Sequence, residues 1–349
     1  MQELSERRLR WLIGLTLVGT MFTAVVMLVG AWTRLVDAGL GCPDWPGCYG
    51  KLLVPDSELA TLRHPDAPLE PFKAWVEMLH RYIASLLGLV VLSVVALGWS
   101  LRHRPSYPWR LSLMLLVVIL LQGAFGAFTV TLKLWPQVVT LHLLGGLSVL
   151  LLFFWLHLRL RRSLATPVCE PRRANALWGI AACLLVVQLA LGGWVSSNYA
   201  GVACQGFPTC NGQWLPAMDI NEGFHITQTV GPNYLHGQLH ADARTAIQVV
   251  HRLGALLLGI GLIVLWWRHR HWPGVARPLA IVVGLYTLQT ALGVANVVLW
   301  LPLWLALLHT AGAIALTTGL VWAWWRWRYP EASVYLTTTH PPYNGVIAQ

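Results

Sequence analysis

The sequence predicts an all-α polytopic membrane protein, with eight transmembrane helices forming two tandem four-helix bundles in parallel-repeat orientation. Of the 349 residues, 56% are hydrophobic and only 11% are charged, whereas a water-soluble domain carries about a quarter charged residues. Eight stretches each supply the ~20 apolar residues that are needed to cross a bilayer. They lie near 11–31, 80–101, 110–130, 138–158, 176–196, 247–267, 278–299 and 303–325.

The basic residues predict the orientation of these spans. Arginines cluster at the amino terminus, in every second connection and after the last span, whereas the alternate loops have few. By the positive-inside rule, both termini are cytoplasmic. The net charge of +10 is therefore a topology signal, and it predicts no nucleic-acid binding. Met1–Arg10 is polar and runs straight into a full span, which predicts no cleavable signal and favours a bacterial plasma (inner) membrane.

An internal repeat predicts the organisation into two halves. Trp32–Cys48 matches Trp194–Cys210 at a shift of 162 residues, and His80-Arg81 matches His251-Arg252 at a shift of 171. Because each half has four spans, the copies have the same orientation in the membrane. We expect an N-terminal half at 1–165, a C-terminal half at 166–327 and a disordered cytoplasmic tail at 328–349.

Two cysteine pairs lie in the long loops on the extracytoplasmic side. Cys42 with Cys48 and Cys204 with Cys210 have identical spacing, and disulfides persist in oxidising compartments. We therefore predict a disulfide in each loop, with a redox-active role for the first pair left open. Zinc is the competing interpretation, although the spacing is not typical of a zinc site.

Four histidines predict two metal centres. His80, His142, His251 and His309 each lie within about two turns of the extracytoplasmic end of a span. A histidine inside a span is costly and needs a partner. Haem iron accepts axial imidazoles, and facing helices of a bundle can supply two of them. We pair His80 with His142 and His251 with His309; the alternative for any single histidine is a hydrogen bond to a neighbour.

Three arginines are candidates for binding haem propionates. Arg81 and Arg252 directly follow histidines, and Arg34 lies at the start of the first loop. Guanidinium groups hold carboxylates through paired hydrogen bonds. The alternative is that these side chains extend to the membrane interface.

One position distinguishes the two halves. Glu77 lies three residues before His80 and shares its helix face, whereas the matching residue of the second half is Gln248. A carboxylate beside a haem edge can accept protons or stabilise developing positive charge. Glu77 is therefore the candidate catalytic residue, and the alternative is a helix cap at the start of the second span.

These residues together resemble the haem A synthase family, whose members oxidise the methyl group at ring position 8 of haem O to the formyl group of haem A. The resemblance extends to about residue 327. It rests on Thr33-Arg34-Leu35, Gly39-Leu40, Asp44-Trp45-Pro46, Glu77-x-x-His80-Arg81, His142, His251-Arg252 and His309.

The resemblance implies that the four histidines are axial ligands. It places a b-type haem cofactor at His251 and His309, and the substrate haem O between His80 and His142, with Glu77 needed for activity. It also implies haem O synthase and an electron acceptor as partners. A di-haem b electron-transfer cytochrome is the main alternative function, and a parallel-repeat transporter is a second one. The loop around 221–241 is longer than the family pattern needs and is expected to form a lid or a partner surface.

Overall fold

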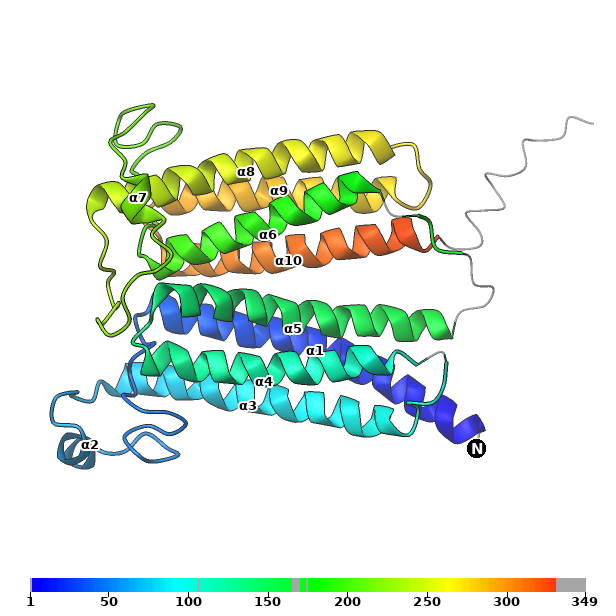
Figure 1. Ribbon diagram of the computed structural model, residues 1–349, viewed down its shortest axis with the longest axis horizontal. Coiled ribbons are helices and arrows are strands. Elements are labelled where there is room, and N and C mark those ends of the chain that lie inside the picture. Colours follow the sequence, from blue (N-terminus) through cyan, green and yellow to red (C-terminus); the bar gives the residue numbers. More distant parts are fainter. Residues whose placement is uncertain (1, 106, 165–169, 174, 331–349) are drawn as a thin grey trace, which may run out of the picture.

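The chain folds into a bundle of long helices lying side by side (Figure 1). The computed structural model describes residues 2–105, 107–164, 170–173 and 175–330. Eight helices among these residues are long and apolar enough to cross a membrane, as predicted. The expected tail falls largely on 331–349, outside the described residues. The helices are α1 (Gln2–Leu35), α2 (Ser57–Arg63), α3 (Pro71–Trp99), α4 (Trp109–Thr131), α5 (Pro136–Ser163), α6 (Ala176–Ser197), α7 (Ile220–Gly223), α8 (Ala241–His269), α9 (Ala276–Val298) and α10 (Leu303–Arg328).

Three of the long helices, α1, α3 and α8, begin well before their predicted apolar stretches. Helix α3 starts at Pro71, because proline is favoured in the first turn, where its missing N–H costs no hydrogen bond. Helix α8 starts at Ala241. Hydropathy marks only the part of a helix that lies in lipid, so it missed these polar first turns. As a result Glu77 lies inside α3, and the alternative that it caps this helix is wrong because Glu70 occupies the cap position.

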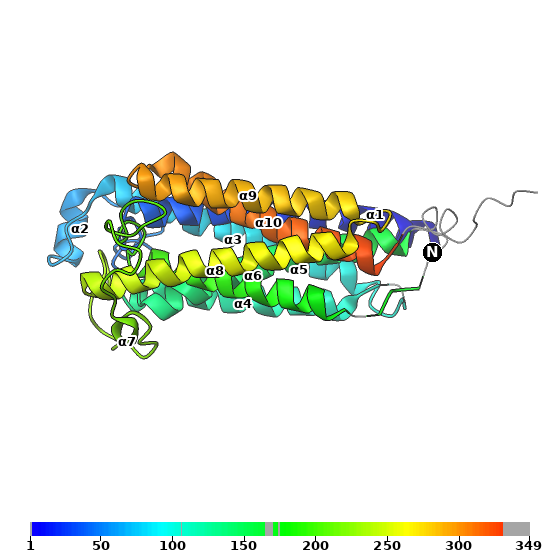
Figure 2. The same cartoon turned by 90° about the horizontal axis from the view of Figure 1, so that it is seen from above.

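The two long loops lie at the same end of the bundle, which we call the loop end. Helices α1 and α6 run in the same direction and both finish there (Figure 1). Figure 2 shows the same gathering of the loops at one end in the perpendicular view. The first helix group consists of α1, α3, α4 and α5, which pack together. In the second helix group, α8 packs on α6 and α9, and α10 packs on α9. Contacts of α5 with α6 and of α1 with α10 join the two groups.

The largest apolar clusters lie away from the loop end. One surrounds Phe153 with Leu12 and Leu115, and the other surrounds Leu262 with Leu279. Dense packing of this kind fixes the helices relative to one another. The four histidines lie in the halves of α3, α5, α8 and α10 that are nearer the loop end.

Candidate functional site

Each of the four histidines packs its imidazole against a glycine of a neighbouring helix. A Cβ atom added to Gly30 of α1 would lie 2.8 Å from Cε1 of His80, closer than ordinary van der Waals contact. Glycine is required where a ring approaches the backbone this closely. The other three pairs are Gly126 with His142 at 3.3 Å, Gly192 with His251 at 3.4 Å and Gly293 with His309 at 3.0 Å.

The histidines come together two by two. His80 on α3 and His142 on α5 are close enough to interact electrostatically, and so are His251 on α8 and His309 on α10. Nδ1 is buried without a hydrogen-bond partner in His80, His142 and His309. Buried polar atoms normally have a partner. Packing therefore holds these rings while leaving imidazole nitrogens free to act as ligands, and this donor set fits haem iron.

Glutamines support the histidine-bearing turns, but not in the same way in each pair. Gln122 Nε2 donates a hydrogen bond to the carbonyl oxygen of His142 at 2.6 Å. The side-chain amide of Gln188 lies 3.2 Å from Nδ1 of His251 and also bonds the His251 carbonyl at 3.1 Å. The position that matches Gln188 in the first half is Val26. A valine side chain has no hydrogen-bonding group, so the matched position offers the ring of His80 no such partner.

Glu77 is a buried carboxylate with two partners. Its side chain is 4% exposed. Oε2 accepts a hydrogen bond from the backbone N–H of Cys42 at 2.8 Å, and Oε1 pairs with Arg81 at 2.5 Å. Gln248 is buried to a similar degree, and its Oε1 has no partner. The first histidine pair therefore has an ionisable group on its helix face, one turn away, that the second pair lacks.

Arg81 and Arg252 fasten the two disulfide-containing loops to the spans. Arg81 donates to the carbonyl oxygens of Asp44, Pro46 and Gly47. Arg252 donates in the same way to Cys204, Gly206 and Thr209 at 2.8–3.1 Å. Sequence reasoning did not foresee these contacts, because loop carbonyls leave no signal in side-chain patterns.

Arg34 lies between the two helix groups. It donates to the carbonyl oxygen of Ser196 at 2.6 Å, and its guanidinium stacks on Tyr199 with 3.9 Å to the ring centroid. The Tyr199 hydroxyl donates to Asp37 at 2.9 Å. Burial raises the pKa of Tyr199, so this hydroxyl stays protonated and remains the donor to Asp37. Asp37 and Tyr199 are matched positions of the repeat, as are Arg34 and Ser196, so the two copies meet through equivalent residues.

Both predicted disulfides are formed. Cys42 is bonded to Cys48 and Cys204 to Cys210. After each pair the chain makes the same tight turn, in which Cys48 pairs with Lys51 and Cys210 with Gln213. In the described part of the chain, no three His, Cys, Asp or Glu side chains converge in a way that would hold a metal ion.

The long second loop reaches across to the first helix group. Tyr234 N–H donates to the Lys133 carbonyl at 3.0 Å, and Trp135 Nε1 donates to the Gln228 carbonyl at 3.0 Å. These contacts place the loop over the connection from α4 to α5, just before His142. In this loop the side chain of His236 approaches Asp37, and that of His240 approaches Glu222.

Comparison with known proteins identifies the family of this chain, and the match extends over nearly its whole length. Residues 10–321 match the family model COX15-CtaA, described as cytochrome oxidase assembly protein. This chain belongs to that family. A protein of Shewanella oneidensis called Heme A synthase is 43% identical over 90% of this chain and 95% of its own length. Proteins of the same name from Rhizorhabdus wittichii and Paracoccus denitrificans are 30% and 31% identical over 90% and 93% of this chain, and over 92% and 89% of their own lengths. As a member of the COX15-CtaA family with eight apolar helices, the chain is a multi-pass membrane protein.

We expect Gly293→Leu to remove haem from the second histidine pair, because the new side chain must displace the ring of His309. The measurement is the haem absorbance per protein after purification. Gly284→Leu on the same helix is the matched control, since a Cβ there meets nothing within 4 Å. Equal haem content in the two variants would contradict the close approach at Gly293.

Proposed function

We propose that this protein is a haem A synthase, an oxidoreductase that converts the C8 methyl group of haem O to the formyl group of haem A for terminal oxidases. The buried carboxylate of Glu77 beside one histidine pair, against Gln248 beside the other, carries the proposal. Two identical electron-transfer centres need no such difference. The name shared by the relatives supports the same activity.

The two histidine pairs have different roles in this proposal. Substrate haem O binds between His80 and His142, next to Glu77. A b-type haem is the resident cofactor at His251 and His309, and it supplies a one-electron carrier when bound. Gln188 is positioned to fix the ring of His251, since its side-chain amide lies 3.2 Å from Nδ1. With the amide oxygen turned toward that nitrogen, Gln188 would accept the Nδ1–H, as the partners of metal-bound imidazoles usually do, and Nε2 would be left for iron.

Glu77 acts on protons at the substrate edge. Conversion of the methyl group to an aldehyde takes two successive hydroxylations, each of which adds oxygen from water and releases two electrons and two protons. The resulting geminal diol loses water to leave the formyl group, and the electrons pass to the proposed electron acceptor. A carboxylate that is shielded from water keeps a strong electrostatic effect on charge developing nearby. Arg81 and the Cys42 N–H hold this carboxylate in place, so that its orientation does not depend on the substrate.

The three arginines are also proposed to bind the propionates. A guanidinium has five N–H donors, and the loop carbonyls leave some of them for a carboxylate. Nε of Arg34 is buried and has no partner. Arg81 and Arg252 follow their histidines directly, so each lies next to the pair that would hold a haem.

The proposed setting is a bacterial plasma membrane with both termini in the cytoplasm. The arginine-rich connections lie opposite the loop end, so the positive-inside rule puts the histidine layer on the extracytoplasmic side. We propose residues 1–165 as the substrate half and 166–327 as the cofactor half, with haem O synthase and an electron acceptor as partners.

Pigment extraction separates the synthase from a di-haem cytochrome. The synthase predicts haem b together with haem O or haem A in purified protein. Haem b alone, at two per chain, would instead make the protein a cytochrome, and no haem at all would favour a transporter.

Glu77→Gln should abolish most haem A formation while the cofactor haem stays bound. Glutamine keeps an acceptor for the Cys42 N–H but removes the charge, and loss of a general acid–base group costs about 10²–10⁴-fold in rate. Product is measured by chromatography of extracted haems. Glu70→Gln, an exposed carboxylate on the same segment paired with Lys73, is the control and should be active. Normal product from Glu77→Gln would remove Glu77 from the chemistry.

Gln188→Leu should lower the affinity of the second histidine pair for haem, although it leaves both ligand histidines in place. Loss of a hydrogen bond to a ligand imidazole lowers metal affinity by about 10–100-fold, and the haem reduction potential should shift as well. Potentiometric titration of the purified protein measures the reduction potential, and the haem absorbance per protein measures the haem that is retained. Gln137→Leu is the control, because that glutamine bonds only the Ile226 carbonyl at the loop end. An unchanged potential in Gln188→Leu would show that Gln188 does not position His251.

A further inference from the structure

The two disulfide loops carry exposed apolar side chains at matched positions. Loop 1 is defined here as residues 42–53 and loop 2 as residues 204–215. Leu52 and Leu53 are 77% and 62% exposed in loop 1, and Trp214 and Leu215 are both 80% exposed in loop 2. Each pair follows directly on the tight turn after its disulfide, and the two pairs are 162 residues apart. An exposed apolar pair that occurs in both copies calls for a common cause.

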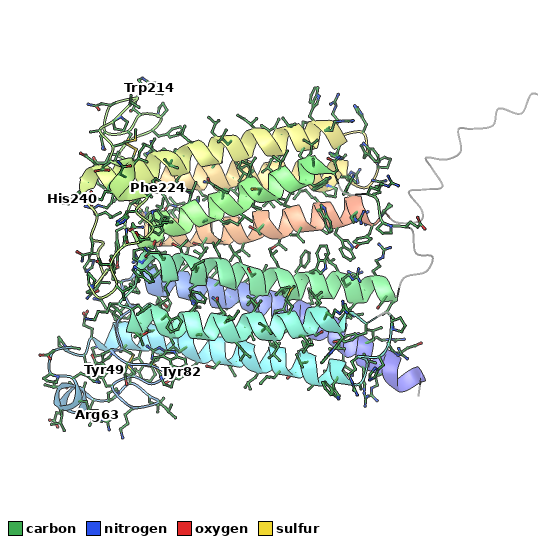
Figure 3. The ribbon with its side chains drawn as sticks, in the orientation of Figure 1. Tyr49, Arg63, Tyr82, Trp214, Phe224 and His240 are labelled. Atoms are coloured by element: carbon green, nitrogen blue, oxygen red, sulfur yellow. A yellow bond between two sulfur atoms is a disulfide. The ribbon has the colours of Figure 1, made fainter. Side chains whose placement is uncertain are left out.

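Loop 1 lies along the lipid-facing side of α3. The hydroxyl of Tyr82 donates to the carbonyl oxygen of Leu52 at 2.5 Å. Tyr82 belongs to the same helix stripe as Leu79 and Leu86, both of which are exposed. In a membrane-spanning helix this stripe faces acyl chains. Figure 3 shows Tyr49 and Tyr82 on the flank of the bundle that faces away from the second helix group.

The depth of Tyr82 places the tip of loop 1 at the membrane boundary. Helix α3 has 29 residues, so it is about 44 Å long against a hydrocarbon core of about 30 Å. The apolar stretch of α3 begins near residue 80, so Tyr82 lies about 3 Å inside the core. Its side chain points back toward the helix N-terminus, so its hydroxyl reaches the boundary between headgroups and acyl chains.

Loop 2 occupies the equivalent flank of the second group. Arg252, one residue after His251, holds the carbonyls of Cys204, Gly206 and Thr209. Phe207 lines an apolar groove of about 660 Å³ on α9 together with Val294, Val298 and Leu299. Trp214 lies on the loop beside α8, on the side away from the first helix group (Figure 3). Both loops are thus fastened beside lipid-facing helices at opposite flanks of the bundle.

We propose that Leu52-Leu53 and Trp214-Leu215 insert into the bilayer leaflet at the loop end and anchor the two disulfide loops in it. Their surface is continuous with the lipid-facing surface of the spans, which identifies lipid as the occupant. Tryptophan and leucine are suited to the boundary region of a bilayer. The anchors hold each loop at its depth, so that Arg81 and Arg252 keep their loop carbonyl partners.

Photocrosslinking of the full-length protein in lipid nanodiscs tests the proposal. A benzophenone amino acid replaces Leu53 or Leu215, and lipid adducts are measured by mass spectrometry after irradiation. Leu86 on α3 is the positive control. Leu62 in α2 is the matched negative control, because it is 81% exposed but belongs to a helix that lies beyond the outer end of α3 (Figure 1).

We expect lipid adducts at positions 53 and 215 in the same yield as at position 86, and no lipid adduct at position 62. Yields at 53 and 215 as low as at 62 would overturn the proposal. Crosslinks from these positions to another protein, or to a second copy of this chain in native membranes, would also overturn it by identifying a different occupant. These readouts do not depend on haem binding or on haem A formation.

Discussion

The arrangement of the loop end depends on one constraint, which is that an arginine inside an apolar span must have its guanidinium satisfied. Arg81 and Arg252 each follow a histidine at a depth where lipid offers no acceptors. Each finds them in the backbone carbonyls of a disulfide loop that folds back along the span. The disulfide and the tight turn keep those carbonyls converging on one point. The loops are therefore part of the structure that holds the histidine layer.

The same interaction separates the two halves chemically. In the first half Glu77 joins the arginine and the loop, so that a carboxylate is held near the histidine pair with its charge compensated. In the second half Gln248 takes that position and Arg252 has only carbonyl partners. A charged pair that is buried is costly to break. The carboxylate is therefore held by contacts within the protein, and the two histidine pairs differ in the charge beside them.

Much of this could be predicted from the sequence, because hydropathy, arginine distribution and the repeat are each set by short stretches of chain. The eight spans, the two disulfides and the family followed from them. Helix starts such as Pro71 could not be predicted in this way, because polar turns outside the lipid have no apolar signal. The glycine at each histidine was missed for a different reason. Gly30 and Gly192 are matched at the same shift as the cysteines, but close approach of a ring becomes visible only when the helices are packed.

The contacts between copies show why the repeat does not produce two independent domains. Arg34 meets Ser196 and Asp37 meets Tyr199, and in both cases the partners are equivalent positions of the two halves. If both copies had kept arginine at the first position, two like charges would face each other in a buried setting. The single guanidinium instead donates to the backbone carbonyl of residue 196 and stacks on the ring of Tyr199. The two halves are therefore joined at the loop end by contacts between residues that differ from one copy to the other, close to both histidine pairs.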